Sequence, residues 1–596
     1  MKDLVERLLT QAEIATDPLT RELAAVMTHP TGVSSAGYPY LQRTAWERFR
    51  DWVPHLMGHG HRVLAAVARL DSALDAQAHT EEERANFKRA KRVIRQVVNT
   101  TAITSPSDLW LLRHVLSAFH ELGVVTRWLN GETVKIEEVA ALPAEITIDL
   151  IFLLSRGVLV KTGGGYRAAE HPTIRAALEA AGPIAPEVPA DLATPWSLAF
   201  AGEALEDGLE GVLTRLVESR IEQVVGLPPR WRAGPAEIEL GYRLVPMIIG
   251  LSMADGVSTL LDAGTVDPTT LCPTRPTLGA GVYATFQAAG LVGATGALTD
   301  IGRRVLQRGP GPFGIIEAYR QYARELRRIL CEGRGAVWVE RSANIAASQA
   351  ANAGTFRQAN DALDALCSET GFEYGVFIEH AMGRGEATRQ RFERSGQDTL
   401  QYVGADLEDA AIDAAEAEQR AGRLPQRMLF VRDADIGRPE TVVGPMVAGG
   451  IDPEGAVMMV GNGLHEARAQ TDESMVEVFR AYERAGLVLL FTEASALSVD
   501  DLLQTAWNTY HAGFKYVHER SGQGLRPALP SPPSRLGDNL PQSWTECALR
   551  AGYVRLDRYC RRSRTIYPYP PANGHNPAIS VNHFFMPARV AKTLTL

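Results

Sequence analysis

Residues 374–386 read YGVFIEHAMGRGE, and the rest of the chain is best interpreted from them. The first five are β-branched, aromatic and few, as in a buried strand. The loop that follows is made of small residues around Gly383 and Gly385, and Ala387–Glu393 begins a helix. Glycines let a backbone approach a ligand, and a helix N-terminus offers N–H groups to it. These residues therefore predict the strand, turn and helix that open a nucleotide-binding α/β sheet.

Four more apolar segments follow at intervals that suit alternating strands and helices. They are Leu400–Gly404, Met428–Val431, Ala456–Val460 and Leu487–Phe491. Polar residues follow the segments, among them Asp406, which stands 21 residues after Gly385 (406 − 385). An acid about 20 positions beyond such a loop binds ribose hydroxyls in these folds. The series predicts an open sheet with a ligand at the carboxyl ends of its strands, closed by two later strands, Tyr553–Tyr559 and Ile579–Phe585.

This ordered series resembles the class I S-adenosylmethionine-dependent methyltransferases. In that family the glycine loop holds the methionine part of the cofactor, the acid after the second strand holds the ribose, and an Asp-x-Asp region lies by the adenine. The resemblance implies an α/β, Rossmann-like core and S-adenosyl-L-methionine as the cofactor. The residues that we assign to cofactor binding on this basis are Glu379, Gly383, Gly385, Asp406, Leu407, Asp433, Ala434 and Asn462.

The loop itself departs from the pattern of that family. The family's loop starts with an acid and three spaced glycines, whereas this one reads Glu-His-Ala-Met-Gly-Arg-Gly over residues 379–385. The cofactor prediction therefore depends on the series of strands and not on the loop.

Composition narrows the functional classes. The 596 residues are 45% apolar, which suits a globular chain with large cores and two to four domains. No run of about 18 apolar residues is present, and the first residues carry acids, so we expect no membrane helix and no signal peptide. Five widely spaced cysteines suit a reducing cytoplasm. A net charge of −9 argues against bulk nucleic-acid binding.

The N-terminal half is predicted to be a large, mainly helical domain. A helix at Ala144–Ser155 is followed by a hairpin pattern at residues 157–167, as in a winged helix, and residues 236–306 repeat the arrangement. The first six residues of that helix are acidic and apolar, which does not suit a DNA-reading helix. Many small-molecule methyltransferases carry such a module, where it dimerises or covers the substrate, so a homodimer stays open. The predicted parts are a helical region at 1–105, a winged-helix-like unit at 106–183, a second such unit at 184–310, linking helices at 311–370 and the methyltransferase core at 371–596.

Histidines are numerous near the predicted ligand edge of the sheet. His380, His465, His511 and His518 account for four of the 14 in the chain, and Gln470 lies among them. A single histidine there is more often a hydrogen-bonded core residue than a ligand. Together, however, two imidazoles and an oxygen ligand can hold a metal with open positions for a chelating substrate. His465 with Glu466 can equally be a general base and its orienting partner.

Two motifs carry a closer resemblance. GNGLHEARAQ at 461–470 and NTYHAGF at 508–514 are similar to segments of the metal-dependent C-methyltransferases of polyketide starter modules, the apratoxin type. Those enzymes methylate a malonyl-type group on an acyl carrier protein, with iron or manganese beside the methyl donor. The resemblance implies His465, Gln470 and His511 as metal ligands, and His465, His511 and Glu466 as catalytic residues.

Three hypotheses remain after the sequence has been analysed. The first is metal-assisted C-methylation of a carrier-bound malonyl-type group in a cytoplasmic enzyme of secondary metabolism. The second is a metal-free O- or N-methyltransferase of a free small molecule, with His465 or His511 as the base. The third is a winged-helix regulator whose degenerate methyltransferase fold binds a ligand without turnover. Bound metal separates the first two, and production of S-adenosylhomocysteine separates both from the third.

Overall fold

The computed structural model describes most of the chain. It covers residues 1–596 except 1, 11, 35–36, 51–55, 78, 219–220, 222–232, 338–341, 396–399, 506, 508, 510, 538–539, 563–566, 569–574 and 595–596. The chain forms two compact units. The helical unit consists of residues 1–339, 499–517 and 566–576, and the sheet unit of residues 340–498, 518–565 and 577–596. Two segments from the C-terminal part of the sequence thus belong to the helical unit.

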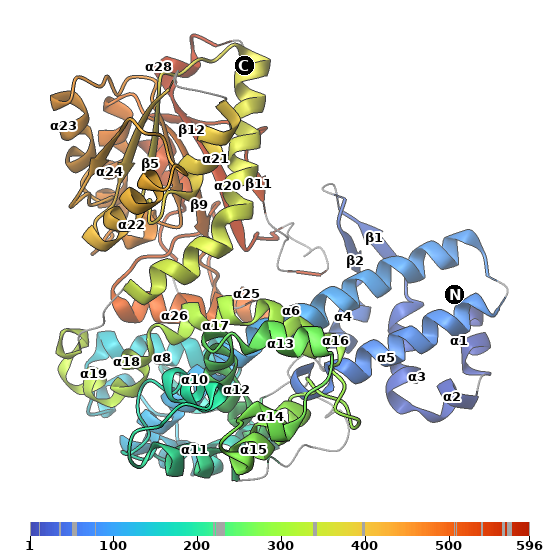
Figure 1. Ribbon diagram of the computed structural model, residues 1–596. Helices are drawn as coiled ribbons and strands as arrows, with labels where there is room; N and C mark the ends of the chain where they lie inside the picture. The colour runs from blue at the N-terminus through green and yellow to red at the C-terminus, as the bar shows by residue number, and fades with distance from the viewer. Residues whose placement is uncertain are drawn as a thin grey trace. The chain divides into compact units, whose positions relative to one another are not determined.

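The helical unit is organised around α6, Glu81–Glu121 (Figure 1). Its 41 residues begin at Thr80, which makes a capping box with Glu83. The main partner of α6 is α12, Pro235–Met253. Gly241 permits this packing, because a Cβ added there would lie 2.4 Å from the Cβ of Leu109 on α6.

The predicted hairpin is present in the helical unit. It consists of β3, Leu159–Thr162, and β4, Gly165–Ala168, paired antiparallel after α8, Pro143–Ser155. The second predicted unit has α15, Pro276–Ala288, and α16, Asp300–Arg308, joined through single bridges such as Val292 with Leu298. The winged-helix identity of both units stays a prediction.

The sheet unit contains one mixed sheet. Its strands are β5 (Val376–His380), β6 (Gln401–Ala405), β7 (Met428–Val431), β8 (Val457–Gly461), β9 (Val488–Ala494), β10 (Tyr553–Arg555), β11 (Arg561–Arg562) and β12 (Ser580–Pro587). The order is β10-β12-β9-β8-β5-β6-β7, with β11 on β12. Strands β5 to β9 are parallel, and β12 is antiparallel to β9 and β10. The direction of crossover reverses at β5, and ligands bind at such a switch point.

This sheet confirms the predicted α/β, Rossmann-like fold. Each of the five predicted parallel strands lies within two residues of its expected start. The predicted strand Tyr553–Tyr559 is too long, because β10 ends at Arg555 and a turn follows in which the Tyr559 N–H donates to the Leu556 carbonyl.

The two faces of the sheet bury separate cores. Val376 and Ile378 of β5 contribute to one cluster and Phe377 to the other, as alternation along a strand requires. One face is covered in part by α24 (Asp472–Arg484) and α27 (Trp544–Arg550), the other by α20 (Ser342–Thr370). Both hydrophobic clusters thus lie on the faces of the sheet, and a ligand is expected at the carboxyl ends of the parallel strands.

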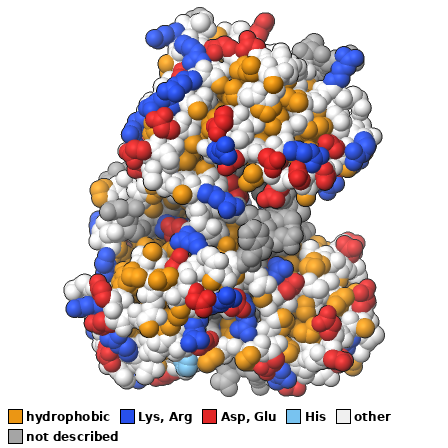
Figure 2. All heavy atoms as spheres, turned by 90° about the vertical axis from the view of Figure 1, so that its left-hand side faces the viewer, with side chains coloured by type: hydrophobic (Ala, Val, Ile, Leu, Met, Phe, Trp, Pro, Cys, Tyr) orange, Lys and Arg blue, Asp and Glu red, His pale blue; other side chains and the backbone are white. Residues whose placement is uncertain are grey.

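Surface charge is mixed rather than segregated. Basic and acidic side chains are interspersed over the face drawn in Figure 2. Many of them pair, as Arg589 does with Glu454 at 3.0 Å and with Glu483 at 2.7 Å. Among the described helices, none is by itself long and apolar enough to cross a membrane; α12 and α13 (Gly256–Ala263) reach the required composition only together, across a bend of 95°.

Candidate active site

The loop after β5 is held in place by Glu379. This carboxylate is buried and accepts hydrogen bonds from the backbone N–H groups of Ala387 at 3.0 Å and Thr388 at 2.7 Å, in the first turn of α21, Glu386–Ser395. Burial raises the pKa of Glu379 to about 7, although these hydrogen bonds oppose the rise. Glu379 thus ties the end of β5 to the first turn of α21, on either side of the glycine loop. Both of its carboxylate oxygens accept hydrogen bonds from that helix.

Asp406 joins the loops that follow β5 and β6. One carboxylate oxygen accepts from the Gly383 N–H at 2.9 Å, and the other accepts from the Glu408 N–H at 3.0 Å. Burial raises the pKa of Asp406. Because each carboxylate oxygen can accept two hydrogen bonds, both oxygens keep acceptor capacity for a diol. The sequence placed both Asp406 and the glycine loop at the ligand edge of the sheet, and the binding of ribose by Asp406 stays a prediction.

The loop after β7 is bound to the same residue. The Ala434 N–H donates to the Asp406 carbonyl at 3.0 Å, and the Asp406 N–H donates to the Val431 carbonyl at 3.2 Å. Asp433 takes the left-handed conformation, with φ of 52°. Leu407 is 43% exposed beside these loops, which suits contact with a flat apolar group. The loops after β5, β6 and β7 are therefore joined through Asp406 along one edge of the sheet.

A histidine and a glutamate meet at the ends of β8 and β9. Glu493 is fully buried in β9, and its carboxylate lies 2.8 Å from Nδ1 of His465. The other oxygen of Glu493 accepts from the Leu464 N–H at 2.6 Å. His465 is 4% exposed, and its ring meets the ring of His518 edge-on at 4.8 Å between centroids. This pair has the geometry of a general base and its orienting carboxylate.

Glu493 was not among the residues expected from the sequence. The residue expected to orient His465 was Glu466, whose nearest carboxylate oxygen lies 3.7 Å from Nε2, beyond hydrogen-bond distance. The Glu466 carboxylate instead accepts from Nε2 of Gln523 at 2.6 Å. The signal for Glu493 was available, because it is an acid two residues after the predicted strand Leu487–Phe491, as Asp406 is after the second strand.

The three predicted metal ligands are divided between the two units. His511 belongs to the helical unit, where Nδ1 lies 3.0 Å from the Thr509 hydroxyl. His465 and Gln470 belong to the sheet unit. The amide oxygen of Gln470 accepts from Nε of Arg526 at 3.0 Å. One lone pair of this oxygen is therefore used by a guanidinium, whose positive charge disfavours a cation beside it. The set of His465, Gln470 and His511 as metal ligands stays a prediction, and Gln470 as found is held by Arg526.

The remaining residues of the prediction lie nearby in the sheet unit. Asn462 follows β8 with φ of 53°, and its N–H donates to the Thr492 carbonyl at 2.8 Å. His380 ends β5 and is 1% exposed, and its two ring nitrogens have no hydrogen-bond partner among the described residues. Burial lowers its pKa to about 3, so the ring is neutral at pH 7.

Comparison with known proteins gives matches only among solved structures. No family model and no curated protein matches this chain. The C-methyltransferase domain of the citrinin polyketide synthase is 12% identical, covers 92% of this chain and 98% of its own, and has a TM-score of 0.32. The CurJ carbon methyltransferase is 11% identical, with 85% and 98% coverage and a TM-score of 0.32. The mitomycin 7-O-methyltransferase MmcR is 14% identical, with 56% and 93% coverage and a TM-score of 0.31. These structures are carbon and oxygen methyltransferases. The Rossmann-like fold of this chain is established by its own sheet order.

Proposed function

We propose that this chain is an S-adenosyl-L-methionine-dependent methyltransferase of secondary metabolism in which His465 removes a proton from the methyl acceptor. The observation that carries the proposal is the contact between His465 and the buried Glu493, at the same sheet edge as the Asp406 loop. A buried carboxylate that fixes the orientation of a histidine is the usual arrangement around a general base.

The cofactor supplies an electrophilic methyl group when it is bound. Asp406 would accept hydrogen bonds from the hydroxyls of the ribose with its remaining lone pairs, and Leu407 would cover the adenine. Gly383 and Gly385 have no side chains, so the methionine part of the cofactor can approach the backbone of the loop. In this way the chain positions the methyl donor without itself taking part in bond making.

Glu493 determines how His465 acts. Its carboxylate accepts a hydrogen bond from the Nδ1–H group of the neutral ring. The lone pair of the ring therefore lies on Nε2. When Nε2 takes a proton from the acceptor, the negative charge of Glu493 stabilises the imidazolium. The acceptor is a carbon acid of the malonyl type, free or bound to a carrier protein, or an acidic hydroxyl. Proton removal without a metal is favoured over a metal-bound enolate because Arg526 holds the oxygen of Gln470.

A methylation assay with two acceptor types tests the proposal. Purified protein is incubated with S-adenosyl-L-methionine and either a malonyl thioester of N-acetylcysteamine or a phenol, and S-adenosylhomocysteine is measured. His465→Ala should lower kcat by about 10²–10⁴-fold, the usual contribution of a general base, while cofactor affinity stays unchanged. Full turnover by this variant would refute the role of His465. No S-adenosylhomocysteine with any acceptor, including malonyl-loaded carrier protein, would favour the non-catalytic hypothesis.

A further inference from the structure

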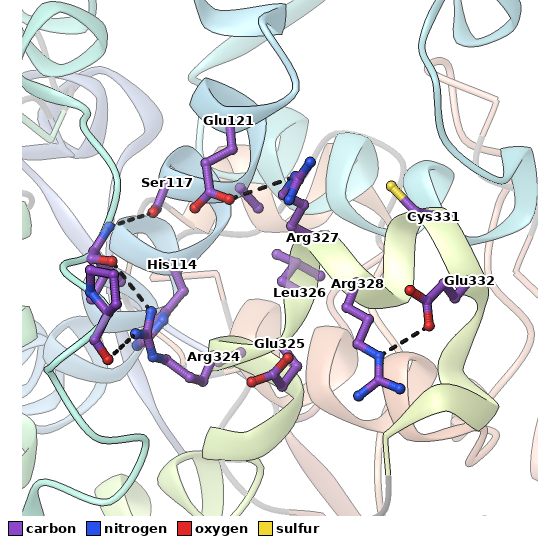
Figure 3. A pocket seen from close by; sticks show the side chains of 14 residues that line it. His114, Ser117, Glu121, Arg324, Glu325, Leu326, Arg327, Arg328, Cys331 and Glu332 are labelled. Atoms are coloured by element: carbon purple, nitrogen blue, oxygen red, sulfur yellow. Dashed lines mark hydrogen bonds and ion pairs between the residues drawn. The ribbon is translucent and has the colours of Figure 1, made fainter.

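The helical unit contains a cavity of about 510 Å³ that the proposed function does not use. Its walls are α6, the segment around Ile184 and Pro186, and the helices α18 (Arg320–Arg324) and α19 (Leu326–Glu332). Figure 3 shows the side chains that line it. A cavity of this size is within the range of pockets that bind small molecules.

The floor of the cavity presents two polar side chains from consecutive turns of α6. His114 is 6% exposed, and its ring packs edge-on against Trp110 and Tyr242, with centroids 4.5 and 5.6 Å away. No described residue makes a hydrogen bond to this imidazole. Ser117 is 4% exposed; its oxygen accepts from the Ile184 N–H at 3.0 Å, while its own proton has no acceptor among the described residues. The His114 imidazole and the Ser117 hydroxyl are therefore both fixed in the cavity wall, and each can still donate a hydrogen bond.

Two guanidinium groups near His114 lack a carboxylate. Arg324 donates to the carbonyls of Ile184, Ala185 and Pro186 at 3.5, 3.0 and 3.3 Å, and Arg113 donates to the Gly182 carbonyl at 2.8 Å. Neither forms an ion pair with any described residue. Burial, together with Arg113 and Arg324, lowers the pKa of His114 to about 3, so the imidazole is neutral at pH 7.

The acidic side chains of the cavity lie among its more exposed residues. Glu121 lies 3.7 Å from Arg327, and Glu332 lies 3.0 Å from Arg328, with side chains 34% and 57% exposed. Figure 3 shows both carboxylates directed at these arginines. Glu325 is exposed and also lines the cavity, so its three arginines and three glutamates balance in number. Arg324, however, forms no ion pair with any described residue, and a small anion would offset its charge.

We propose that this cavity is a second ligand site, which binds a small molecule that carries a carboxylate. The carboxylate accepts from the Ser117 hydroxyl and from the N–H of the neutral His114, in the field of Arg324. Hydrogen bonds to an ionised acceptor are about twice as strong as neutral ones, which favours an acid over its amide. Ile184 and Leu326 are among the apolar residues of the lining and suit contact with an apolar body.

The test uses a matched pair of fluorinated probes. 4-(Trifluoromethyl)benzoate and 4-(trifluoromethyl)benzamide are titrated against the full chain and followed by fluorine NMR. The benzoate should bind at least about tenfold more tightly than the amide, which equals about 1.4 kcal/mol. Ser117→Ala and His114→Phe should each weaken the benzoate about five- to tenfold and leave the amide nearly unchanged.

Arg328→Gln is the control, because it removes a positive charge from α19 that is already paired with Glu332. This variant should bind the benzoate within about twofold of the unaltered chain, since a paired surface charge contributes little. Circular dichroism checks that each variant folds. If His114→Phe does not fold, Ser117→Ala still decides the matter, because it removes one oxygen only. Equal binding of the two probes, unchanged affinity in Ser117→Ala, or no binding at 10 mM probe would each overturn the proposal.

Discussion

Replacement of Glu493 by glutamine tests the proposed base directly, because it changes charge with almost no change of shape. In the native chain one oxygen of Glu493 accepts from the Leu464 N–H at 2.6 Å, and the other lies 2.8 Å from Nδ1 of His465. The glutamine amide keeps one acceptor and gains two donors. If its oxygen stays with Leu464, the NH₂ group faces Nδ1 and forces the ring proton onto Nε2. His465 then has no lone pair for the acceptor.

The opposite amide orientation is also unfavourable. It restores an acceptor for Nδ1 but places the NH₂ group against the Leu464 N–H in a fully buried position. Two opposed donors leave a buried group unsatisfied, at a cost of about 1–3 kcal/mol. We therefore expect Glu493→Gln to lower kcat by about 10²–10⁴-fold, or about 3–5 kcal/mol in activation free energy.

The assay is steady-state release of S-adenosylhomocysteine, together with calorimetry of cofactor binding. The affinity for S-adenosyl-L-methionine should be unchanged, because Glu493 contacts the histidine and not the glycine loop. Glu454→Gln is the matched control, since Glu454 is on the surface and pairs with Arg589. A kcat within about threefold of the unaltered enzyme in Glu493→Gln would refute the argument, because one amide orientation leaves Nε2 without a lone pair and the other opposes two donors in a buried position.

Three further predictions follow from the same sheet edge. Asp406→Ala should weaken S-adenosyl-L-methionine binding by about 1–3 kcal/mol in calorimetry, with Asp409→Ala, on the exposed surface, as the control. Glu379 has a pKa raised to about 7, so the folded chain holds more protons than the unfolded chain between about pH 4.5 and 7. The free energy of unfolding should therefore fall as pH rises through this window, and Glu379→Gln should flatten the fall in chemical denaturation. Treatment with a chelator should leave turnover intact, because Arg526 holds Gln470; activity lost with the chelator and restored by iron or manganese would return the metal-assisted mechanism.

The fold was predictable because its signals are local. Each parallel strand is a short apolar run, and alternation along β5 separates Ile378 and Phe377 into two cores. The carboxyl ends of parallel strands must lie at one edge, so the placement of Asp406 and Gly383 at the same edge was predictable, and the structure adds the hydrogen bond between them. Placements of this kind need only the identity of the elements and their sequence.

The carboxylate that contacts His465 was harder to predict, because the contact depends on how two neighbouring strands pair. Glu466 is adjacent to His465 in sequence, but residues i and i+1 point apart, and its carboxylate lies 3.7 Å from the ring. Glu493 is 28 residues away and becomes the neighbour because β8 and β9 pair in parallel. The return of residues 499–517 to the helical unit, which takes His511 with it, has no local signal either. Such placements are decided by tertiary packing.

The backbone of the glycine loop shows how the chain accommodates an alanine at position 381. Ala381 stands where the family has a glycine, and it adopts the left-handed conformation with φ of 55°, as Gly383 and Gly385 do with φ of 51° and 82°. A side chain in that region costs of order 1–3 kcal/mol, and such a conformation persists only where the surroundings impose it. Here the Met382 N–H donates to the Ala405 carbonyl and the Gly383 N–H to Asp406. The loop therefore keeps left-handed backbone at residues 381, 383 and 385 despite its altered sequence, and its hydrogen bonds to Ala405 and Asp406 hold it in that shape.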